Sequence, residues 1–72
     1  MTVREIIAAK AEALGYDGYE IAHACKKLNN GKWVIAVDHV NKYLRGEKDM
    51  TTEKLDAVLE VLELDLIDKH PF

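Results

Sequence analysis

Apolar residues recur at intervals of three and four along most of this sequence, which is the spacing of amphipathic helices. The first series predicts a helix over residues 3–14, opened by a capping box in which the side chains of Thr2 and Glu5 each bind the other's backbone N–H. A second series predicts a helix over residues 18–28, which ends before the turn sequence Asn29-Asn30-Gly31.

Residues 32–37 are harder to interpret, because their β-branched side chains favour a strand. No second strand signal in the sequence offers a pairing partner. We therefore interpret them as an extended connection whose Trp33 and Ile35 fill the core. A third helix is predicted to start at residue 36 or 38 and to run to residue 45, where Gly46 ends it.

The last long helix is predicted to follow a cap at Thr51 or Thr52, on an apolar series of Leu55, Val58, Leu59 and Leu62. A two-residue alternation of Leu64, Leu66 and Ile67 comes next and favours a short strand or an extended tail. The fold class is therefore all-α. We expect one domain over residues 1–72, a compact bundle of four or five short helices with an extended apolar C-terminal tail.

A chain of 72 residues has room for one small domain. Its single cysteine excludes an internal disulfide and a site built from several thiolates. No apolar stretch reaches the roughly 18 residues of a membrane span, and no signal-peptide pattern is visible, so we expect a cytoplasmic protein without a membrane partner. Catalytic motifs are absent too, and we predict no enzyme activity, no metal and no cofactor.

Charge is distributed unevenly along the chain, although the formal net charge is only −3. Residues 26–48 carry six basic and two acidic side chains, a net charge of +4. Residues 1–25 and 49–72 have net charges of −2 and −5. Such segregation is expected of a small protein that presents one face to a polyanion. A chance fluctuation on a solvated surface produces the same pattern, so charge alone leaves both interpretations open.

The strongest pattern runs over residues 40–67, 28 of the 72 residues. It consists of Val40-Asn41-Lys42-Tyr43-Leu44-Arg45-Gly46-Glu47-Lys48, then Met50-Thr51-Thr52, then Leu55-Asp56-Ala57-Val58-Leu59-Glu60-Val61-Leu62-Glu63-Leu64. This succession resembles the lambda-repressor/Cro-like helix-turn-helix family, in which a recognition helix ending in a basic residue and glycine is followed by a short basic loop, a Ser/Thr cap and a leucine-rich helix. Upstream, Glu20-Ile21-Ala22 is similar to the start of that family's second helix.

Three features depart from the family pattern. The connection over residues 26–34 is several residues longer than the tight turn of the family. Gly18 and Tyr19 stand near the position of the usual phosphate-binding Gln or Ser, and Glu63 stands where a glycine is common. Because the connection is longer, the angle between the two helices of the motif can differ from that of the family.

The resemblance implies that residues 36–45 enter the major groove of DNA, with Val40 and Leu44 facing inward. The base contacts would then come from Asp38, His39, Asn41, Lys42 and Arg45. We expect Asp38 to cap the helix as well. The phosphate contacts would come from Lys26, Lys27, Lys32 and Lys48. Polar side chains on a short helix are more often only a solvated face, which is the plain alternative.

The sequence thus predicts a sequence-specific DNA-binding transcriptional regulator of bacterial or phage type. Its partners would be double-stranded DNA and a second copy of the chain, joined through Leu64, Leu66, Ile67 and Phe72. The alternative is a protein–protein adaptor, or an antitoxin-like accessory protein, on a repressor-like fold that has lost or weakened DNA binding. In that case the acidic C-terminal helix is the candidate surface for a protein partner.

Overall fold

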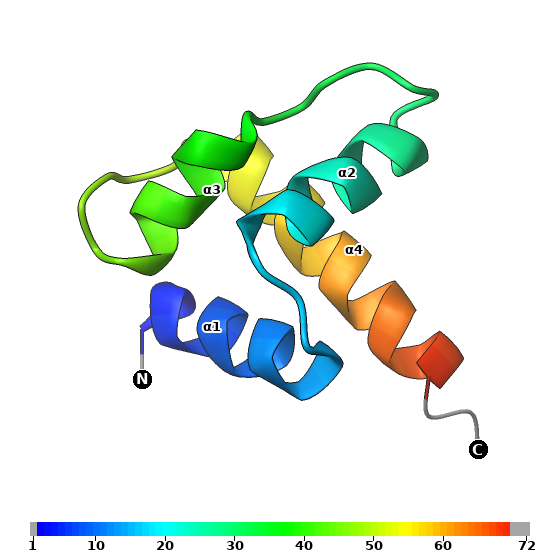
Figure 1. Ribbon diagram of the computed structural model, residues 1–72, viewed down its shortest axis with the longest axis horizontal. Coiled ribbons are helices and arrows are strands. Elements are labelled where there is room, and N and C mark those ends of the chain that lie inside the picture. Colours follow the sequence, from blue (N-terminus) through cyan, green and yellow to red (C-terminus); the bar gives the residue numbers. More distant parts are fainter. Residues whose placement is uncertain (1, 70–72) are drawn as a thin grey trace.

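The computed structural model of the protein describes residues 2–69, and these residues form four helices. Helix α1 spans Val3–Leu14, α2 spans Gly18–Leu28, α3 spans Val37–Leu44 and α4 spans Thr52–Lys69. Figure 1 shows α2 crossing in front of the N-terminal part of the long α4, α1 to one side of α4, and α3 at the end of the molecule where α4 begins. The predicted all-α class is confirmed, and within the described residues no helix is long and apolar enough to cross a membrane.

The helix ends follow the local chemistry of the sequence. The Thr2 hydroxyl accepts the backbone N–H of Glu5 at 3.2 Å, and the Glu5 carboxylate accepts the backbone N–H of Thr2 at 3.4 Å, which confirms the capping box. Gly15 ends α1 with a φ of 73°, a left-handed conformation that glycine adopts without strain. Asp17 caps α2 by accepting the N–H of Glu20 at 3.1 Å.

A single apolar core holds the four helices together. Its fully buried side chains come from every helix and from the connection between α2 and α3, and the largest are Ile7, Ile21, Val40, Val58 and Leu62. Helix α4 packs against both α1 and α2, while α3 packs mainly against α2. Helix α3 is therefore held to the fold mainly through α2, and its outer side is left open.

The predicted extended tail is wrong. Leu64, Leu66 and Ile67 lie in the last turns of α4, which continues without a break to Lys69. Leu66 follows Leu62 by one helical turn and packs against the core, so this spacing outweighs the two-residue alternation. The Tyr16 hydroxyl also donates to the Asp65 carboxylate at 2.8 Å, which joins this end of α4 to the turn between α1 and α2.

The connection between α2 and α3 is extended and irregular, as predicted, but its Trp33 does not fill the core. Ile35 is buried, with 2% of its surface exposed, whereas Trp33 is 52% exposed. The indole lies instead against the outside of α2, where it contacts the ring of His23. Ile35 is therefore the main anchor of the connection, and Val34 packs partly against the core beside it.

Candidate nucleic-acid interface

Helix α3 is the predicted recognition helix, and its burial pattern separates two faces. Val40 and Tyr43 are buried against the core, and Asp38 and Arg45 are exposed. The N-cap of α3 is Ala36, whose methyl group cannot accept a hydrogen bond, so the predicted capping by Asp38 is wrong. Asp38 lies inside the first turn and its carboxylate pairs with the Lys42 ammonium group at 3.1 Å.

Asn41 does not project freely from α3. It is half-buried and its side-chain amide lies against Gly18 at the start of α2, where a Cβ atom added to the glycine would lie 2.1 Å from the Asn41 Oδ1 atom. A larger residue at position 18 would therefore force the Asn41 side chain to move from this position. A contact between Asn41 and a base requires the amide to leave this position.

The remaining predicted base-contacting side chains also have partners within the protein. The Nε2 atom of His39 lies 2.9 Å from the carbonyl oxygen of Asp49, so this nitrogen carries the proton in that contact. The Arg45 guanidinium group pairs with the Glu47 carboxylate. Both Arg45 and Lys42 are bound to exposed carboxylates, and surface pairs of this kind contribute only ~0–1 kcal/mol. A phosphate group of a ligand can therefore replace the carboxylate in either pair.

Arg4 of α1 takes part in this region, which sequence reasoning missed. Its Nε atom donates to the carbonyl oxygen of Tyr43 at 2.9 Å, and its guanidinium group lies over the Tyr43 ring at 4.7 Å from the centroid. A second nitrogen donates to the Asp49 carboxylate at 2.9 Å and to the carbonyl oxygen of Lys48 at 3.3 Å. Arg4 thus holds the C-terminal end of α3 and the following loop. No local motif signals a contact between residues so far apart in sequence.

The predicted phosphate-binding lysines lie on segments that precede and follow α3. Lys26 and Lys27 are in the last turn of α2, Lys32 is in the connection, and Lys48 is in the loop before α4. Figure 1 shows these segments and α3 along one edge of the molecule, with α1 and the C-terminal half of α4 on the opposite side. The basic segment of the sequence therefore occupies neighbouring parts of the fold, although Asp38, Glu47 and Asp49 lie among its basic groups.

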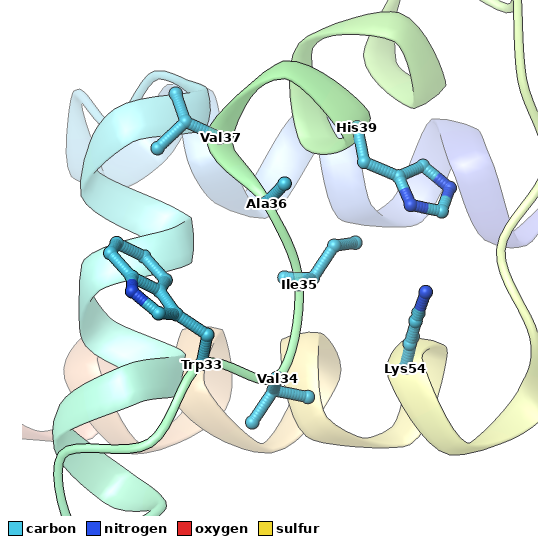
Figure 2. A pocket seen from close by; sticks show the side chains of 7 residues that line it. All are labelled: Trp33, Val34, Ile35, Ala36, Val37, His39 and Lys54. Carbon is cyan, nitrogen blue, oxygen red and sulfur yellow. The ribbon is translucent and has the colours of Figure 1, made fainter.

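A shallow cavity of about 400 Å³ lies between the connection, α3 and the start of α4 (Figure 2). Its lining is mainly apolar and comes from the connection, with the rings or head groups of Trp33, His39 and Lys54 at its margins. In Figure 2 the side chains of His39 and Lys54 lie on the same side of the connection, and Trp33 lies on the other side, next to α2.

Neither nucleophilic nor metal chemistry finds support in the described residues. Cys25 is buried in the core, and burial raises the pKa of its thiol to about 11, so the thiol stays protonated at neutral pH. No group of three or more His, Cys, Asp and Glu side chains within residues 2–69 is placed to hold a metal ion.

The predicted dimerisation residues have different environments. Leu64 and Ile67 are 45% and 58% exposed, whereas Leu66 packs partly against the core and contributes to the fold itself. Phe72 lies outside the described residues. Beside Leu64, a surface hollow of about 550 Å³ runs between the C-terminal ends of α2 and α4, and Leu28 lines its other side.

Comparison with known proteins adds no assignment to this geometry. No family model matches the chain, and neither a curated protein nor a solved structure shows significant similarity to it.

Proposed function

We propose that this protein binds double-stranded DNA as a transcriptional regulator, with the outer face of α3 in the major groove. The observation that carries this proposal is that the segments before, within and after α3, which carry six basic residues, run along one edge of the fold. DNA is a line of phosphates, and most of the affinity of a small protein for it comes from neutralising them. Most of the acidic side chains of α4 follow its exposed surface, whereas Asp38, Glu47 and Asp49 lie near α3 and are paired with basic groups there.

Base readout in this proposal falls mainly to Lys42 and Arg45. Both have long side chains on the open face of α3, and each exchanges a carboxylate partner on the protein for an acceptor on guanine or a phosphate. Asn41 holds the α2–α3 geometry through its contact with Gly18 in the free protein. A homodimer completes the proposal through the exposed Leu64 and Ile67, and sedimentation analysis of the protein alone tests this part.

The test compares two lysine variants of equal charge change. Lys42 pairs with Asp38 on α3, and Lys10 pairs with Glu63 at 3.9 Å on the α1–α4 side. Lys42→Gln should weaken binding to a mixed-sequence duplex and reduce the slope of log affinity against log salt by about 0.9, since one phosphate contact is lost. Lys10→Gln should leave both unchanged.

Amide shifts recorded during the same titration locate the surface. Binding through α3 predicts changes concentrated in residues 26–48 that diminish as salt is raised. Equal effects of the two lysine variants, or shifts confined to residues 53–67, would contradict the proposal.

A protein–protein adaptor is the second candidate, and one observation favours it. The basic groups of Arg4, Lys42 and Arg45 are already paired with carboxylates in the protein, which lowers the positive potential of the α3 face. The exposed side of α4 is acidic, with Glu53, Asp56, Glu60 and Glu63 on its surface. Amide shifts on α4 with a basic partner peptide, and none with DNA, would support the adaptor.

A further inference from the structure

The outer face of α2 carries a cluster of aromatic rings that DNA binding through α3 does not use. Tyr19 and His23 are one helical turn apart, and their ring centroids are 4.1 Å apart with an interplanar angle of 38°. Trp33 comes back from the connection to place its ring 5.0 Å from that of His23, in an edge-to-face arrangement. Tyr19, His23 and Trp33 form a continuous row, which we name the aromatic row.

The aromatic row is open to solvent. Tyr19 is 58% exposed and Trp33 is 52% exposed. His23 and Lys26 both reach Trp33 from α2, so the two contacts come from the helix side and more than half of the indole surface is left for a ligand. Contiguous exposed aromatic surface of this kind is typical of a binding site rather than of a solvated helix face.

The charge around the His23 and Trp33 end of the aromatic row is positive, whereas Asp17 and Glu20 flank Tyr19 at the other end. Residues 21–37 contain no Asp or Glu, and the same stretch contains Lys26, Lys27 and Lys32. The Lys26 ammonium group lies 4.4 Å from the centroid of the Trp33 ring, which places a cation directly on the aromatic row. A ligand for this surface should therefore combine flat aromatic groups with negative charge along its length.

Single-stranded nucleic acid has this combination, because its bases offer open π faces and its backbone carries a phosphate at every residue. Duplex DNA lacks the first property, since its base faces are covered by stacking inside the helix. We propose that the aromatic row binds single-stranded DNA or RNA, with bases stacked on Trp33 and Tyr19 and phosphates bound by Lys26, Lys27 and Lys32. Stacking on exposed rings is tolerant of sequence, so the binding discriminates little between bases.

The aromatic row lies on α2 and at the margin of the cavity, which Trp33 also lines. Figure 2 shows Trp33 on the α2 side of the connection, away from His39 and Lys54. Lys26, Lys27 and Lys32 are phosphate contacts for both kinds of nucleic acid, whereas only the single strand uses the rings and only the duplex uses Lys42. Substitutions at Trp33 and at Lys42 therefore separate the two activities.

Trp33 is the only tryptophan in the sequence, so its fluorescence reports directly on the aromatic row. Adding an oligothymidylate of about twelve nucleotides, within the usual site size, should quench this fluorescence to saturation. Affinity should fall as salt rises, while the quenching at saturation should stay constant, because salt screens the phosphates and not the stacking.

Three variants test the role of the rings through the anisotropy of a labelled oligothymidylate. Trp33→Leu keeps an apolar side chain but removes the π face, and should weaken binding about tenfold or more. Trp33→Phe keeps an aromatic ring, so it should lower the affinity for the oligothymidylate much less than Trp33→Leu does. Tyr19→Leu should weaken binding in the same direction as Trp33→Leu. Because both native rings are exposed, the helical circular dichroism of all variants should match that of the native chain.

Two results would overturn the proposal. Equal affinities of the Leu and Phe variants at residue 33 would show that no base stacks there. Inorganic polyphosphate or an oligoglutamate peptide that binds as tightly as the oligothymidylate would show a site for any polyanion. Duplex binding provides the remaining comparison: Trp33→Leu should leave it unchanged, and Lys42→Gln should leave single-strand binding unchanged.

Discussion

The two segments that flank α3 are held by different combinations of interactions. The connection before it, residues 29–36, is anchored by apolar side chains, with Ile35 buried and Val34 partly buried on the core. The loop after it, residues 45–51, buries Met50 but is also held by Arg4 through hydrogen bonds to backbone carbonyl oxygens and a carboxylate. Salt screens an exposed ion pair but does not screen apolar burial. The N-terminal end of α3 should therefore be the less sensitive of the two to salt.

The largest effect is expected at the anchor of the connection. Ile35→Ala should lower the free energy of unfolding by about 3 kcal/mol, because it removes buried methyl groups and leaves a cavity. In a domain of this size that loss approaches the entire stability of ~3–5 kcal/mol. Urea unfolding followed by circular dichroism measures it. Leu28→Ala is the matched control: Leu28 is 48% exposed, and a loss as large as that of Ile35→Ala would contradict the role given to burial.

A smaller effect is expected at the loop after α3. Arg4→Met keeps most of the side-chain length and removes the hydrogen bonds to Tyr43 and Lys48, and should lower the free energy of unfolding by about 1 kcal/mol. The Asp49 carboxylate is 95% exposed. Asp49→Asn should therefore change the free energy of unfolding by less than about 0.5 kcal/mol. If the two variants lost equal stability, the ion pair rather than the carbonyl contact would hold the loop.

An effect of the same size as that of Arg4→Met is expected where α2 meets α3. Gly18→Ala places a methyl group on the Asn41 amide, which must rotate away, and should destabilise the fold by about 1 kcal/mol. The same substitution in an Asn41→Ala background should be neutral or stabilising, because alanine favours a helix over glycine. A double-mutant cycle from urea unfolding measures this coupling. A cycle with no coupling would contradict the contact.

Local chemistry accounts for the parts of this fold that were predicted correctly. The bounds of α1 and α2 follow from Thr2, Asp17 and Gly15, whose capping interactions involve only neighbours in the sequence. The end of α4 was predicted wrongly because Leu64, Leu66 and Ile67 satisfy a two-residue and a helical period at once. Packing on the core decided between the two periods.

The candidate site was less predictable than the helices. The sequence alone states which side chains residues 26–48 carry and what their charges are. The distant contacts could not: Arg4 is 39 residues from Tyr43, and Asn41 meets Gly18 across two helices. The sequence also did not show that Ile35 enters the core while Trp33 stays on the surface.

By itself, the sequence determined the helical class, the capped ends of α1 and α2, and the separation of a basic segment from two acidic ones. These depend on interactions within a few residues and on charge, which is additive along a chain. The tertiary structure alone decided that the basic segments lie along one edge, that Arg4 holds α3, and that Trp33 joins Tyr19 and His23 on the surface. Each of these depends on which side chain fills a limited core, and that is settled only when all the helices pack together.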